Sequence, residues 1–129
     1  MSTLTSAAAP YRLVVAAGPA VPAGVVGDAV ARTVRDGTPV AVVIPAVLPA
    51  SLPLWAAPQR LLDRVSRQRR AARERMELLG LPGTVDVVPC RSVTAAIASL
   101  CSERPPAEIV VAGAASWRLR RTLRAIGSG

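Results

Sequence analysis

Short apolar runs alternate along this chain with segments whose apolar residues recur every three or four positions. Four runs are rich in valine and isoleucine, as strands are: residues 12–17, 40–44, 84–88 and 109–112. The intervening segments have helical spacing: residues 24–36, residues 59–79, the stretch from Ser92 to the Pro105 stop, and residues 117–126. Strands that alternate with helices predict parallel β–α–β units with right-handed crossovers. We therefore expect an α/β three-layer sandwich with a mostly parallel, Rossmann-like sheet of four or five strands.

The length of 129 residues corresponds to one domain, and we expect residues 1–10 to be a flexible tail before a domain at 11–129. Residues 37–59 carry no charge and are long enough to cross a bilayer. Five prolines in this stretch would remove helical hydrogen bonds repeatedly, so it predicts a buried strand that runs into an extended loop. No signal peptide is visible. The chain is therefore expected to be cytoplasmic, with no membrane partner.

The charge and composition of the chain limit the ligands it can bind and the reactions it can catalyse. All 16 basic residues are arginine, and the net charge of +8 favours anionic partners. The chain has no histidine, which excludes Ser-His-Asp and Cys-His catalysis. Cys90 and Cys101 fit no metal or redox spacing and are expected to pack as small apolar side chains, although a disulfide between them stays open. We expect no metal and no enzyme activity.

The C-terminal segment carries the clearest signal for a ligand. A β-branched run stops at Gly113, an arginine-bearing segment follows, and Gly127 and Ser128 close the passage. Ligands of open parallel sheets bind outside the carboxyl ends of the strands, where glycine lets the backbone approach phosphate closely. Ser116 and Ser128 can donate hydrogen bonds, and Arg118 can contact phosphate oxygens. The alternative is that Gly113 only ends a strand and that the terminus is frayed.

This order of elements resembles the universal stress protein family, which has an adenine-nucleotide α-hydrolase-like fold. Nucleotide-binding members share a motif of Gly, two residues, Gly, nine residues, then Gly and Ser or Thr. Gly113 stands at its first position, Ser116 replaces the second glycine, and Gly127-Ser128 arrives one residue late. The aspartate that usually ends the first strand is absent from the Ala17-Gly18-Pro19 stretch, and a fifth strand is not evident.

The resemblance implies a stress-associated binding protein that holds ATP or AMP weakly, with slow ATP hydrolysis as an alternative. It implies that Val43 touches the adenine and that the ribose and phosphates are lined by Gly113, Ser116, Gly127 and Ser128. Gly18 and Arg118 complete the expected site. It also implies a homodimer, or a protein partner, that pairs with an open sheet edge.

A second function class is an interaction module that has kept the fold and lost the nucleotide site. The arginines between Arg64 and Arg75 could bind nucleic acid, but helical spacing also lets them pair with Asp63, Glu74 and Glu77 on a solvated face. Trp55 could anchor an interface or cap the core beneath its proline-rich loop.

Overall fold

Strands and helices alternate throughout the computed structural model, which describes residues 10–33, 37–114 and 117–128. The elements are β1 (Arg12–Ala16), α2 (Ala23–Ala31), β2 (Val40–Val47), α3 (Gln59–Leu79), β3 (Gly83–Cys90), α4 (Val93–Glu103), β4 (Glu108–Ala112) and α5 (Trp117–Ser128). Every strand and helix expected from the sequence is present. The expected tail lies outside the described residues, apart from Pro10.

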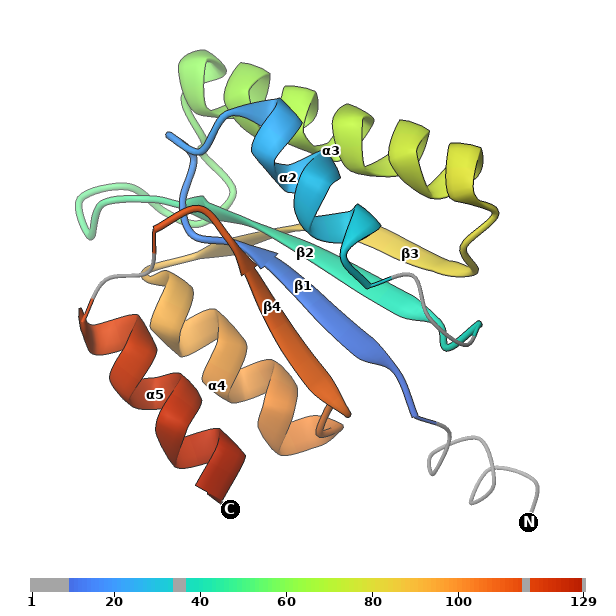
Figure 1. The fold of residues 1–129 in the computed structure, drawn as a ribbon. Coiled ribbons are helices and arrows are strands. Elements are labelled where there is room, and N and C mark those ends of the chain that lie inside the picture. The colour runs from blue at the N-terminus through green and yellow to red at the C-terminus, as the bar shows by residue number, and fades with distance from the viewer. Residues whose placement is uncertain (1–9, 34–36, 115–116, 129) are drawn as a thin grey trace, which may run out of the picture.

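The four strands form one parallel sheet in the order β3-β2-β1-β4. Helices α2 and α3 cover one face of this sheet, and α4 and α5 cover the other (Figure 1). The predicted three-layer α/β sandwich is therefore confirmed. Because β1 connects to β2 on one face and β3 connects to β4 on the other, the crossovers change direction between β1 and β4.

Apolar side chains fill both faces of the sheet, which explains why its strands are continuous apolar runs. Val14 and Ala16 of β1 belong to the cluster under α2 and α3, whereas Leu13 and Val15 belong to the cluster that contains Ile97 of α4. All of these side chains are buried. Burial of each large aliphatic side chain contributes about 1.5–3 kcal/mol, so the two clusters supply most of the stability.

Strand β2 is longer than the predicted run of residues 40–44 because it continues through Pro45. The amides of Val40 and Leu48 both donate to the β3 side, so by alternation the nitrogen of Pro45 faces the β1 side. Pairing between β1 and β2 ends at Val15↔Val43. Pro45 lies beyond this point, so its missing N–H removes no hydrogen bond between the two strands. The uncharged stretch is thus a strand followed by a loop, as predicted. None of the helices among the described residues is long and apolar enough to cross a membrane.

The long helix α3 begins and ends where the sequence predicts, and Gly80 ends it in the left-handed conformation with φ 63°. Its inward stripe differs from the predicted one. Helical spacing puts Leu62 and Leu79 on the apolar stripe of this segment, yet both are exposed, whereas Gln68 is buried. Helix α2 is shorter than residues 24–36, because it ends at Ala31 and residues 34–36 lie outside the described part of the chain.

Both cysteines are free and buried, so the disulfide that the sequence left open is not formed. Burial raises the pKa of the Cys90 and Cys101 thiols, and a backbone hydrogen bond at Ser92 lowers the pKa of Cys90 in part. The thiols of the folded chain therefore stay protonated to a higher pH than those of the unfolded chain, whose pKa is about 8.5.

We predict that the free energy of unfolding falls as the pH rises above about 9, because only the unfolded thiols then lose protons readily. Urea unfolding across this pH range measures the effect. The Cys90→Ala, Cys101→Ala double variant is the control and should lose less stability over the same range. If either thiol is alkylated in the folded protein as fast as it is alkylated in urea, the thiol is not buried and the prediction is wrong.

Candidate functional site

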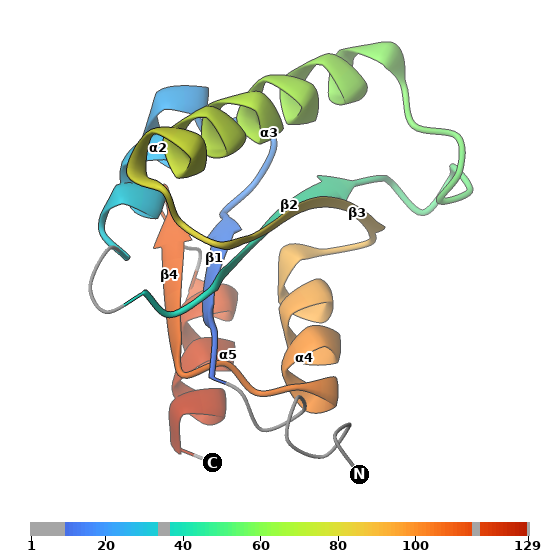
Figure 2. The ribbon, with the colours of Figure 1, turned by 90° about the vertical axis from the view of Figure 1, so that its right-hand side faces the viewer.

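The carboxyl ends of the four parallel strands bring four connections to one edge of the sheet (Figure 2). The loop after β1 begins at Ala17, and the loop after β2 extends to Pro58. Arg91 and Ser92 join β3 to α4, and Gly113 follows β4. The crossovers change direction between β1 and β4, and this is the position at which parallel α/β proteins bind ligands.

A pocket of about 350 Å³ opens at this edge on the side of α4 and α5. Its wall combines the loop after β1 and the start of α4 with one residue each from β2 and α5: Ala17, Gly18, Pro19, Val47, Arg91, Ser92, Val93, Thr94 and Leu119. Gly18, one of the predicted site residues, therefore lines this pocket. A side chain added at Gly18 would meet no atom within 4 Å, so this glycine leaves open space. Among the residues that the structure describes, the lining includes an arginine and no carboxylate, which favours an anionic ligand.

The first turn of α4 gives this pocket donors. The Ser92 side chain caps the helix by accepting a hydrogen bond from the amide of Ala95 at 3.0 Å. The amide of Ala96 donates to the Ser92 carbonyl, so the amides of Val93 and Thr94 have no acceptor among the described residues. Unpaired amides at a helix N-terminus carry partial positive charge and bind anions. Arg91 fixes the neighbouring loop, because its Nη1 donates to the carbonyls of Pro49 and Leu52 at 2.6 Å each.

Gly113 follows β4 as predicted, but packing explains why it is glycine. Its φ is 94°, and a Cβ placed there would lie 2.7 Å from Cγ2 of Val21 and 3.6 Å from Cβ of Ala17. The loop after β1 therefore packs directly against this turn. A substitution at Gly113 would disturb the turn itself, so loss of a ligand in such a variant would not show that Gly113 binds one.

Gly127 and Ser128 do not lie beside Gly113. They form the last turn of α5, which starts at the carboxyl edge and runs back toward the opposite edge (Figure 1). At 1.5 Å per residue they lie about 15 Å along the helix from Trp117. Arg118 lies in the first turn of the same helix, and Ser116 lies outside the described residues. The predicted Gly-Ser phosphate loop is therefore not assembled, because the helix continues through it.

Val43 is also separated from Gly18. Its side chain is buried in the cluster on the α4 face and lines a different pocket of about 290 Å³ between β2, β3 and α4. An adenine bound beside Gly18 would therefore need to extend toward α4 before it reached Val43.

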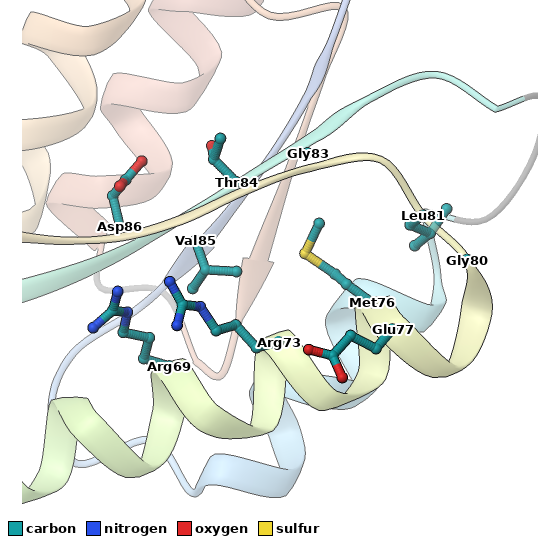
Figure 3. A pocket seen from close by; sticks show the side chains of 10 residues that line it. All are labelled: Arg69, Arg73, Met76, Glu77, Gly80, Leu81, Gly83, Thr84, Val85 and Asp86. Atoms are coloured by element: carbon teal, nitrogen blue, oxygen red, sulfur yellow. The ribbon is translucent and has the colours of Figure 1, made fainter.

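A larger pocket, of about 500 Å³, lies at the opposite end of β3, where that edge strand passes α3 (Figure 3). Arg69 and Arg73 extend from α3 toward the strand, and Val85 points back toward the helix. Asp86 and Glu77 also line this pocket, so its charge is mixed. Size alone therefore does not make it the candidate site.

The exposed arginines of α3 are less paired than the sequence predicts. Among the described residues, Asp63 accepts a hydrogen bond from Gln59, and Arg75 forms an ion pair with Asp28 of α2 at 3.4 Å. The predicted pairs of Glu74 and Glu77 with neighbouring arginines are not found within the described ranges. Trp55 is 87% exposed, so the interpretation as a core cap is wrong.

Sequence reasoning missed Gln68, which holds the loop after β1 in place. Its side chain is buried at 1% exposure, and its Nε2 donates to the carbonyls of Gly18 at 3.0 Å and Val21 at 2.9 Å. Its position on the inward stripe, between Val65 and Ala72, was the available signal. An uncharged polar residue on an apolar stripe must find hydrogen-bond partners when it is buried.

The chain is a parallel α/β domain of the Rossmann-like three-layer type, and a pocket whose described lining includes Arg91 opens at the carboxyl ends of its strands. Comparison with models of known protein families gave no match, and neither did comparison with curated protein sequences. The resemblance to universal stress proteins therefore stays a prediction.

Proposed function

We propose that this chain is a non-enzymatic binding protein of the universal stress protein type, which holds an adenine nucleotide weakly at the carboxyl edge of its sheet. One observation carries the proposal: the pocket beside Gly18 combines a helix N-terminus and Arg91 and has no carboxylate among its described lining residues. Phosphate oxygens would accept from the amides of Val93 and Thr94. The choice of an adenine nucleotide comes from the resemblance alone.

Each part of the pocket has a separate role in this proposal. The open space at Gly18 lets a phosphate approach the backbone, and the Arg91 guanidinium adds charge. Leu119, which also lines the pocket, adds an apolar contact for a sugar or base. With no histidine in the chain, the proposed role is to bind the nucleotide and report its level to a partner, without cleaving it.

We predict that ATP or AMP raises the melting temperature. At ten times its Kd a ligand stabilises the folded state by about 1.4 kcal/mol, which corresponds to roughly 5 °C for a chain of this size. Calorimetric titration measures the same binding directly. Gly18→Val should abolish both signals by filling the pocket, because the added side chain meets open space rather than a neighbour.

Gly24→Ala serves as the matched control, since Gly24 also has open space around it but does not line the pocket. Its response to nucleotide should equal that of the unmodified protein. No shift at millimolar nucleotide, or a shift that persists in Gly18→Val, would reject the proposed site.

A second candidate function is an interaction module that works without nucleotide. It is favoured by the exposure of Trp55 and Leu54, which are neighbours on the loop after β2. One such partner is a second copy of the chain, paired along an edge strand, β3 or β4. Another is nucleic acid, bound to the exposed arginines of α3. Solution mass, together with the salt dependence of any nucleic-acid binding, separates these partners from each other.

A further inference from the structure

A second basic pocket lies on the other side of the loop after β1, between the start of α2 and the middle of α3. Its volume is about 290 Å³. It is lined by Pro19, Ala20, Val21, Pro22, Ala23, Arg64, Arg67 and Gln68. The two pockets share Pro19 of the loop after β1, but the proposed nucleotide pocket is completed by residues at the start of α4 and by Leu119 of α5, which lie on the opposite face of the sheet. None of the described residues that line the second pocket is acidic.

The start of α2 leaves backbone donors unpaired at this pocket. The residue before the helix is Pro22, whose side chain provides no cap. The amides of Val25 and Val26 both donate to the Pro22 carbonyl, at 3.0 and 3.4 Å. The amides of Ala23 and Gly24 therefore have no acceptor within the described residues, and they form the positive end of the helix dipole.

Arg64 and Arg67 bring two positive charges to the same place. They are three residues apart on α3, which puts them on one face of the helix, and both are exposed. Neither forms an ion pair with a carboxylate of the described residues. Their guanidinium groups are therefore available to an anion held at the start of α2.

Gln68 supplies a further observation that points to a ligand. Its Nε2 is fully used by the carbonyls of Gly18 and Val21, which fixes the orientation of the amide. Its Oε1 is buried and has no hydrogen-bond partner within the described part of the chain, although Gln68 lines the pocket. A buried acceptor without a partner is costly, so the complementary ligand carries a hydrogen-bond donor as well as negative charge.

We propose that this pocket binds inorganic phosphate. At neutral pH inorganic phosphate keeps at least one P–OH group, which can donate to Oε1 of Gln68. Its charged oxygens accept from Arg64, Arg67 and the amides at the start of α2. Sulfate has the same shape and charge but keeps no proton at this pH. A phosphate monoester has largely lost its second proton, because that pKa is about 6.

Calorimetric titration of the full chain at neutral pH with phosphate, sulfate and methyl phosphate tests the proposal. Phosphate should bind at least about fivefold more tightly than either other anion, because only it satisfies the Gln68 acceptor. Arg64→Gln and Arg67→Gln should each weaken phosphate binding about fivefold. Arg70→Gln is the matched control, since Arg70 is exposed on the same helix and does not line the pocket.

Four outcomes would overturn the proposal. The absence of phosphate binding would do so directly. Sulfate binding as tight as phosphate binding would show that the anion does not use the Gln68 acceptor. Equal weakening in Arg70→Gln would show that the anion responds only to the general positive charge of the protein. Tighter binding of methyl phosphate would assign the pocket to a phosphate ester instead. Because the pocket beside Gly18 also favours anions, the Arg64→Gln and Arg67→Gln variants assign the binding to this pocket, since neither arginine lines the pocket beside Gly18.

Discussion

Gly83→Ala is expected to destabilise the protein by at least about 4 kcal/mol, or to prevent folding. Gly83 opens β3 at φ 147°, and a Cβ there would lie 1.8 Å from the carbonyl oxygen of Val40 and within 2.9 Å of its carbonyl carbon and nitrogen. These are backbone atoms of β2, and Val40 is the register partner of Gly83. No side-chain rotation can relieve the contact, so the start of the β2–β3 pair would separate.

Urea unfolding of Gly83→Ala beside Gly80→Ala measures this effect. Gly80 also has a positive φ, of 63°, but its surroundings are open, so its substitution carries only the cost of the left-handed conformation, about 1 kcal/mol. The difference between the two variants is the cost of the contact with Val40. Equal losses of stability would show that β3 does not approach β2 as closely as described.

The layers of the fold could be predicted because each element has a strong local pattern. Residues 40–44 and 109–112 are β-branched runs, and the stripe from Leu61 to Met76 has helical spacing. The end of β2 could not be predicted, because tolerance of Pro45 depends on where β1 stops pairing. The spacing of residues along the sequence does not show where the neighbouring strand β1 stops pairing with β2.

The candidate site was predicted only in part, for a related reason. Gly18 and Gly113 follow strands, so their place at the carboxyl edge follows from the strand pattern. Gly127 and Ser128 could reach that edge only if the chain turned before them, but α5 continues to Ser128. The contact between Gly113 and Val21 and the bonds of Gln68 join segments far apart in sequence. A single sequence does not show such pairs.

Gln68→Glu is the second substitution from which we expect a large effect, about 3 kcal/mol of destabilisation at pH 7. The introduced carboxylate would replace the Nε2 donor that now serves the carbonyls of Gly18 and Val21, so negative charge would face two acceptors in a buried position. Arg64 and Arg67 line the same pocket and would offset part of this cost, but both are exposed to solvent.

The stability lost in Gln68→Glu should increase as the pH rises. Burial and the two carbonyls favour the protonated acid, so its pKa in the folded state lies above the value of about 4.3 in the unfolded chain. Stability is then retained below about pH 4 and lost as the pH rises through the folded-state pKa. Gln68→Met, which has a similar shape and no charge, should show a smaller loss without this pH dependence. If both variants unfold alike from pH 4 to 8, Gln68 does not hold the loop after β1 through its amide, and the shared wall of the two pockets must be fixed by other contacts.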